Sequence, residues 1–404
     1  MPEAESAAQA TTPAEFAVVA TEGSFDGERY CAGPLTLHLD GGRIREVSTG
    51  DYGGAFEGRG VRVVRGAFVM PGFVDAHVHL LLHGVPVDGP SRAAHAKQPV
   101  EALLEAARAS ARQSLRYGVC HVRDAGDRYA INDMIRDEVA GGATGMTKVY
   151  SAGIGLKRPK QYGAFIGLDV TDRASIIAAV TERNVRADAI KIVLTGLIDF
   201  ERGAVTDEPQ FATEEAALIV NAAHRCGKPT LAHCSGLKGL EVAAEARVAS
   251  IEHGFFMSRA MLALMCERRI AWTPTFCPVH FQWACPQACG WSQAAVSNLR
   301  RILDAHREHL RLAHEMGVEL LLGTDAGSMG VEHGKAVTQE IRHYVEAGLP
   351  LEAALKAATT TNRRHLGLPD ARIAPCNRFE ALLFEESPFA KLSALESPCR
   401  IWSG

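Results

Sequence analysis

The chain has 404 residues, of which 47% are hydrophobic and 22% are charged. This composition is typical of a globular protein with one large domain, alone or with a small companion. The formal net charge of -4 is small, so the sequence lacks the basic excess of a nucleic-acid-binding or membrane-surface protein.

The first 13 residues are rich in Ala, Glu, Gln and Thr. Because they lack a basic start and an apolar centre, residues 1–13 are predicted to be a disordered tail and not a secretory peptide. No apolar run approaches the roughly 20 residues of a membrane span. The ten cysteines include no Cys-x-x-Cys pair, which favours a reduced compartment over a disulfide framework. We therefore expect a cytoplasmic protein.

Residues 14–70 consist of short apolar strands separated by Gly-rich turns, a pattern that predicts a small antiparallel sheet. From residue 71 to residue 368, short apolar runs alternate with longer amphipathic segments. The predicted strands cover residues 73–80, 119–126, 148–154, 189–195, 229–234, 250–255, 271–276 and 319–325. The predicted helices include residues 98–117, 172–186, 213–226, 237–247, 258–268, 291–316 and 334–348. Eight strand–helix units favour a (β/α)8 barrel of the TIM type over an open sheet.

Two histidines on the first predicted barrel strand suggest a metal site. Side chains two residues apart on a strand point to the same side, so His77 and His79 present two imidazoles together. In a (β/α)8 barrel the active site lies at the carboxyl ends of the strands. Four other strands carry or end in ligand-type residues, namely Lys191, His233, His253 and Asp325. Because the carboxyl ends of all these strands would meet at one end of the barrel, the pattern predicts a metal centre there.

The motifs resemble those of the amidohydrolase superfamily over nearly the whole chain. The residues that flank the motifs are similar to those of its imidazolonepropionase- and prolidase-like branch. The residues that carry the resemblance are Pro71-Gly72-Phe73-Val74-Asp75-Ala76-His77-Val78-His79, Lys191, Ile251-Glu252-His253-Gly254, His233 and Gly323-Thr324-Asp325-Ala326-Gly327. The resemblance implies a small β-sandwich beside the barrel, built from both chain ends, here residues 14–70 and 369–404.

The resemblance also implies two divalent metal ions. One would be held by His77, His79 and Asp325, and the other by His233 and His253. Lys191 would bridge them as a carboxylysine, because a buried lysine has a lowered pKa and its neutral amine can add CO2 to form a carbamate. Zinc suits these nitrogen and oxygen ligands, and manganese or iron stay open.

This arrangement implies hydrolysis of an amide bond through a bridging hydroxide, with Asp325 as the catalytic group that accepts the proton and passes it to the leaving amine. The same site also fits a lactone, a carbamate, an organophosphate or a cyclic amide. A mononuclear deaminase is disfavoured, because the related deaminases have a glutamate where this chain has Gly236. A non-catalytic scaffold is disfavoured because the ligand set is complete. The Pro-Gly turn common near the family's C-terminus is replaced by Pro375-Cys376.

The loop after the third predicted strand is basic and suggests how substrate is recognised. Arg158 could hold a carboxylate bidentately and Tyr162 could donate a hydrogen bond, although a solvated basic loop is an equal alternative. His333, after the last strand, could line the pocket. We expect a small-molecule substrate, a dipeptide or an N-acyl amino acid, and a homo-oligomer without nucleic-acid or membrane partners.

Overall fold

The computed structural model describes residues 15–85 and 89–404, which divide into two compact units. Unit 1 comprises the chain up to Gly72 and again from Pro369, and unit 2 runs from Phe73 to Leu368. The predicted disordered tail, residues 1–13, lies outside the described residues. Within the described part of the chain, no helix is long and apolar enough to cross a membrane.

Unit 1 is built around one seven-stranded sheet with the order β18-β17-β5-β1-β3-β4, and β2 pairs with β1. The strands are β1 (Glu15–Phe25), β2 (Tyr30–Ala32), β3 (Leu35–Asp40), β4 (Arg43–Thr49), β5 (Arg62–Pro71), β17 (Glu380–Phe384) and β18 (Arg400–Ser403). Two short helices, α1 (Gly53–Glu57) and η3 (Leu392–Glu396), complete the unit. The sheet is mixed and not antiparallel throughout, because β1 pairs with β5 in parallel. The described residues of this unit are connected in one sheet, so the unit is β-rich and the predicted sandwich stays a prediction.

The core of unit 1 joins the two ends of the chain. Val18 of β1, Leu37 of β3 and Leu383 of β17 belong to one buried cluster. Strand β17 pairs antiparallel with β5, with Leu382 opposite Met70. The buried face explains the apolar alternation of β3, because every second side chain of a strand lies on the same face.

Unit 2 alternates parallel strands with helices. Its strands are β6 (Phe73–Val78), β7 (Val119–Asp124), β8 (Lys148–Ser151), β9 (Gly155–Lys157), β10 (Gly167–Asp169), β11 (Ile190–Val193), β12 (Ile198–Asp199), β13 (Ala204–Val205), β14 (Thr230–Cys234), β15 (Ser250–His253) and β16 (Ala271–Thr273). They form two parallel sheets, β6-β7-β8 and β10-β9-β11-β14-β15-β16, and one hairpin of β12 and β13. Buried strands of this kind are rich in Val, Ile and Ala because both faces are covered.

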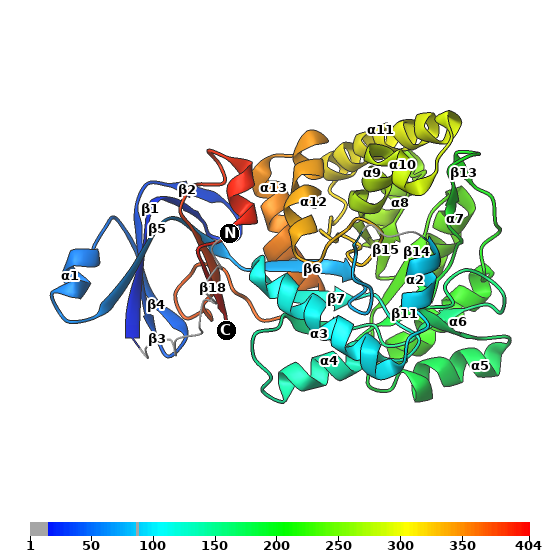
Figure 1. Ribbon diagram of the computed structural model, residues 1–404, viewed down its shortest axis with the longest axis horizontal. Coiled ribbons are helices and arrows are strands. Elements are labelled where there is room, and N and C mark those ends of the chain that lie inside the picture. Colours follow the sequence, from blue (N-terminus) through cyan, green and yellow to red (C-terminus); the bar gives the residue numbers. More distant parts are fainter. Residues whose placement is uncertain (1–14, 86–88) are drawn as a thin grey trace. The chain divides into compact units, whose positions relative to one another are not determined.

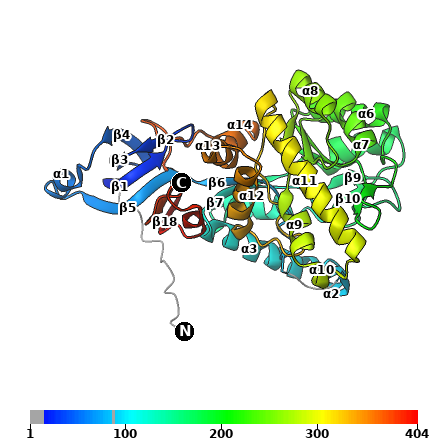
Figure 2. The same ribbon diagram turned by 90° about the horizontal axis from the view of Figure 1, so that it is seen from above.

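The helices of unit 2 are α2 (Gly89–His95), α3 (Val100–Arg116), α4 (Ile131–Ala140), α5 (Arg173–Ala178), η1 (Ala179–Arg183), α6 (Thr213–Arg225), α7 (Leu237–Ala246), α8 (Arg259–Arg268), α9 (Phe276–Ala284), α10 (Pro286–Cys289), α11 (Gln293–Met316), α12 (Lys335–Glu346), α13 (Leu351–Lys356), η2 (Ala357–Thr361) and α14 (Asn362–His365). Helices α3 and α4 lie to one side of β6 and β7, and α11 and α12 lie to the other (Figure 1). Figure 2 shows α11, in yellow, running across the unit.

The eighth predicted strand, residues 319–325, is replaced by isolated bridges in the structure. Leu320 pairs with Trp272 and Ala326 pairs with Val78. The backbone of this segment nevertheless joins β16 to β6, since Leu321 N donates to Trp272 O at 2.8 Å and Ala76 N donates to Leu322 O at 2.9 Å. The strand ladders of the described residues do not close into one sheet, so the closed barrel stays a prediction.

Candidate metal centre

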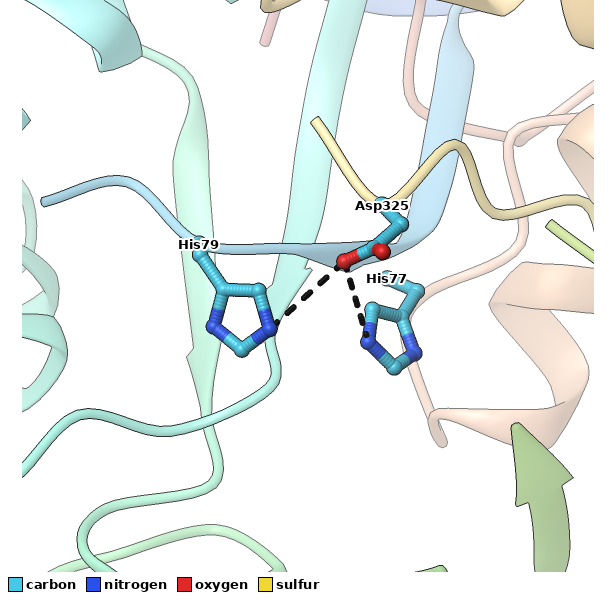
Figure 3. Close-up of side chains that lie close together, drawn as sticks. All are labelled: His77, His79 and Asp325. Atoms are coloured by element: carbon cyan, nitrogen blue, oxygen red, sulfur yellow. Dashed lines mark ion pairs between the residues drawn. The ribbon is translucent and has the colours of Figure 1, made fainter. Parts of the chain in front are cut away.

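Three ligand-type side chains converge at the end of β6. His77 lies within β6, His79 follows it, and Asp325 comes from the segment after the Leu320 bridge. One ligand atom from each of them lies within 4.8 Å of the others. Asp325 Oδ1 is 3.6 Å from His77 Nε2 and 3.6 Å from His79 Nε2 (Figure 3). The three groups therefore face a common point, as metal ligands do.

Hydrogen bonds fix which nitrogen each histidine presents. His77 Nδ1 is 2.6 Å from the Glu252 carboxylate, and His79 Nδ1 is 3.2 Å from the carbonyl oxygen of Gly126. Both acceptors require a protonated Nδ1, which leaves each Nε2 with a free lone pair. Burial lowers the pKa of both histidines, that of His79 to about 3, so both imidazoles are neutral at neutral pH. His77 Nε2 is buried and has no hydrogen-bond partner.

His253 links this group to His233. The ring of His253 lies 5.0 Å from the ring of His77 and 4.5 Å from that of His233. Nδ1 of His253 is 2.7 Å from Thr275 Oγ1. Burial lowers the pKa of His233 to about 3 and that of His253 well below its ordinary value. Four neutral imidazoles thus lie in one continuous cluster.

Lys191 of β11 completes the set predicted from the sequence. Its side chain is fully buried, and its Nζ has no hydrogen-bond partner. Burial lowers the pKa of Lys191. In its protonated form, the positive charge of Lys191 lowers the pKa of the other predicted ligands, namely His77, His79, His233, His253 and Asp325. A buried amine without a partner costs free energy unless something else satisfies it. This lysine therefore fits an amine modified to a carbamate, as the sequence predicts.

The backbone at the centre is held in an uncommon conformation. His253, Thr275 and Asp325 have φ values of 67°, 50° and 56°, in the left-handed region that non-glycine residues rarely adopt. Such strain costs on the order of 1–3 kcal/mol per residue and tends to gather at functional sites. Gly323 allows the close approach of this segment, because a Cβ there would lie 2.8 Å from His77 Cβ.

The substrate residues predicted from the sequence have different positions. The Arg158 guanidinium donates to the carbonyl oxygens of Gln210 and Val170 and is paired with Glu215. All three of its nitrogens therefore already have partners within the protein, and its contact with a substrate carboxylate stays a prediction. His333 is fully buried and its Nε2 lies 2.7 Å from the Leu82 carbonyl oxygen, so it does not line an open pocket.

Tyr162, the other residue predicted from that loop, lies beside the histidine cluster. Its ring is 5.1 Å from the ring of His233 and 6.2 Å from that of Phe165, which in turn lies 5.7 Å from the ring of His79. Burial and the charge of Asp325 raise the pKa of Tyr162 above its ordinary value. The hydroxyl therefore keeps its proton and is able to donate a hydrogen bond.

A buried ion pair supports His77 and was not predicted. Arg123 Nη2 donates to Glu252 Oε1 at 2.8 Å, and Arg123 Nε donates to the carbonyl oxygen of Ala76 at 2.6 Å. Ser250 Oγ also donates to Glu252, at 2.5 Å. A charged residue inside an apolar strand needs a partner, so the two charges at positions 123 and 252 were the sequence signal for this ion pair. The sequence also did not indicate that Arg92 lies near Asp325.

Metal binding at this centre is expected to weaken as the pH falls from about 8 to about 6. Burial raises the pKa of Asp325 and lowers that of Lys191. A proton then competes with the metal for Asp325 at pH values where an exposed aspartate is already ionised, and carbamate formation needs the neutral amine. Zinc titrations of metal-stripped protein across this range measure the effect, and an affinity independent of pH would contradict it.

The comparisons with known proteins identify the family of the chain. The profile of the Amidohydrolase family matches residues 68–384. The chain is a member of the amidohydrolase family, and the structural neighbours together with the strand–helix alternation identify unit 2 as a TIM-barrel-like domain. The predicted resemblance to this superfamily is therefore confirmed.

Two relatives and two solved structures illustrate the likeness. An uncharacterized protein of Mycobacterium tuberculosis is 28% identical over 310 residues, 76% of each chain. Ochratoxinase of Aspergillus niger is 28% identical over 265 residues, 63% of this chain and 53% of that protein. Its crystal structure has a TM-score of 0.78 at 20% identity, covering 96% of this chain and 93% of that one. A Xaa-Pro dipeptidase with bound methionine has a TM-score of 0.77 at 24% identity, covering 95% and 97%.

Proposed function

We propose that this amidohydrolase-family hydrolase cleaves the amide bond of a dipeptide or N-acyl amino acid with the help of two divalent metal ions. The observation that carries the proposal is the clustering of His77, His79 and Asp325 around one point, with His77 Nε2 and Lys191 Nζ buried and without hydrogen-bond partners. The likeness to a Xaa-Pro dipeptidase supports an amide as the bond that is cleaved.

The donor set fits two cations. His77, His79 and Asp325 would hold one, His233 and His253 the other, and carboxylated Lys191 would supply one oxygen to each. Neutral imidazoles and carboxylate oxygens are ligands that zinc accepts. Cations bound there would polarise the substrate carbonyl and lower the pKa of water toward neutrality.

Asp325 has the geometry of a proton carrier. Its Oδ2 accepts a hydrogen bond of 2.9 Å from Ser328 Oγ, and its Oδ1 faces the two histidine nitrogens. Because burial raises its pKa toward neutrality, the carboxylate is suited to accept a proton from the attacking water and to give it to the leaving amine. Tyr162, whose ring lies 5.1 Å from that of His233, would donate a hydrogen bond to the substrate.

The test combines metal analysis with a substrate panel. We expect about two metal ions per chain, a carbamate on Lys191, and turnover of dipeptides or N-acyl amino acids. His77→Ala should remove metal and activity and leave the circular dichroism spectrum unchanged, whereas His314→Ala, at an exposed histidine of α11, should change neither. One metal per chain with an unmodified Lys191 would refute the binuclear centre. Turnover of lactones or organophosphates but of no amide would refute the substrate class.

A further inference from the structure

Arg92 lies at the edge of the metal centre, on the helix that follows the strand of His77. Its Nη2 donates a hydrogen bond of 2.9 Å to the carbonyl oxygen of Gly327, two residues after Asp325. Gly327 lies in the turn that Ser328 N closes by donating to the carbonyl oxygen of Asp325, and Ser328 Oγ donates to the Asp325 carboxylate. Gly327 has a φ of 100°, and a Cβ there would lie 2.5 Å from the His79 carbonyl oxygen. The guanidinium is thereby held against the backbone that positions Asp325.

The surroundings leave most of this guanidinium unused. Arg92 is half-buried, and within residues 15–85 and 89–404 it donates to the Gly327 carbonyl oxygen and forms no ion pair with a carboxylate. Its positive charge nevertheless acts on Asp325, His79 and Tyr162. The contrast with Arg158 is direct, because every nitrogen of Arg158 is bound to the protein. An arginine whose guanidinium keeps unused donors beside a catalytic group is suited to bind a carboxylate.

We infer that Arg92 binds the carboxylate of the substrate's leaving amino acid. The inference rests on the proposed amide hydrolysis and adds the group that selects the substrate. Asp325 would protonate the leaving nitrogen, and in an α-amino acid the carboxylate lies on the carbon next to that nitrogen. A cation close to Asp325 is therefore on the leaving-group side of the scissile bond. The charges of Asp325 and Arg92 also act on the Tyr162 hydroxyl.

Two structural roles for Arg92 must be separated from this one. The residue fastens α2 to Gly327, and its charge favours the ionised form of Asp325. Loss of either role would slow the hydrolysis of every substrate alike. Loss of a carboxylate contact would slow only those substrates that carry the carboxylate, so paired substrates distinguish the three roles.

The experiment compares N-acyl amino acids with the matching N-acyl amino acid amides, in which a neutral carboxamide replaces the carboxylate. Arg92→Met is expected to lower kcat/KM for the acids by about 10–100-fold, the loss of one charged hydrogen-bonding contact, and to change that for the amides by less than about threefold. Arg92→Lys should recover part of the loss, because it restores the charge without the fork. Arg173→Met, at an exposed arginine of α5, is the matched control and should behave as wild type.

Binding of a product gives a readout that needs no turnover. Free L-phenylalanine should bind the metal-loaded wild type at least about tenfold more tightly than L-phenylalaninamide, and Arg92→Met should abolish this difference. Equal losses for acids and amides, or no preference for the free acid in the wild type, would overturn the role of Arg92. If the wild type hydrolyses neither the N-acyl amino acids nor their carboxamides, the proposed function is refuted. Binding of L-phenylalanine would still test the role of Arg92.

Discussion

An Asp325→Asn variant is expected to have a kcat/KM about 10²–10⁴-fold below that of the wild type, which is the typical contribution of a general acid–base group. Asparagine has nearly the same shape and can still accept the hydrogen bond from Ser328, which is 2.9 Å long in the native chain. It cannot take up and release the proton that the mechanism needs. The measurement is steady-state kcat/KM on the best amide of the panel, with the metal content of the same sample determined in parallel.

The metal content decides how that loss is interpreted, because Asp325 is also part of the ligand group. If the Asn variant keeps its metal and loses activity, the carboxylate acts as a proton carrier. If it loses both, the residue is mainly a ligand. Ser328→Ala, which removes only the hydrogen bond to Oδ2, is the matched control and should slow the reaction by less than about tenfold. An Asn variant within tenfold of wild type, with full metal, would contradict both roles.

Local sequence patterns were sufficient to find the ligands that lie on strands. His77 and His79 could be paired because strand side chains alternate, and both flank the end of β6. Lys191 stood out because a lysine in the run Ile190–Val193 is a charge in an apolar, buried strand. Residues of this kind are visible because a short-range rule connects their spacing to their direction.

Long-range partners were not visible. Arg158 was predicted to meet substrate, but its partner Glu215 lies 57 residues further along the chain. His333 reaches the carbonyl oxygen of Leu82, 251 residues earlier. The left-handed backbone of His253, Thr275 and Asp325 has no sequence signal, because none of them is a glycine. Such contacts are set by tertiary packing, which local propensity does not encode.

The fold shows the same division. Helices α6 and α8 begin and end within a few residues of their predicted limits, since amphipathic spacing and capping are local. The predicted strand 271–276 ends at Thr273, and Phe276 begins helix α9 instead. Glu340 explains this turn, because its buried carboxylate accepts hydrogen bonds from Phe276 N at 2.8 Å and from Cys277 N at 3.0 Å. That support comes from a residue more than 60 positions away.

A Glu252→Ala variant is expected to lower the free energy of unfolding by about 3–5 kcal/mol, because it leaves the Arg123 charge buried without its partner. Both side chains are almost completely buried and are joined at 2.8 Å. Burial alone would raise the pKa of Glu252, but the charges of Arg123 and Lys191 hold it below its ordinary value. The carboxylate is therefore ionised in the folded protein. Denaturation of metal-stripped protein measures the loss without the contribution of bound metal.

Glu252→Gln separates stability from metal binding. The amide can still accept a hydrogen bond from Arg123, so the stability loss should be smaller, about 1–3 kcal/mol. His77 Nδ1, now 2.6 Å from a carboxylate, would face a neutral group, and zinc affinity should fall about 10–100-fold. Ser250→Ala, which removes the hydroxyl donor but keeps the carboxylate, should affect zinc affinity little. If Gln lowers stability and leaves zinc affinity at the wild-type value, Glu252 serves the fold alone and does not orient His77 for the metal.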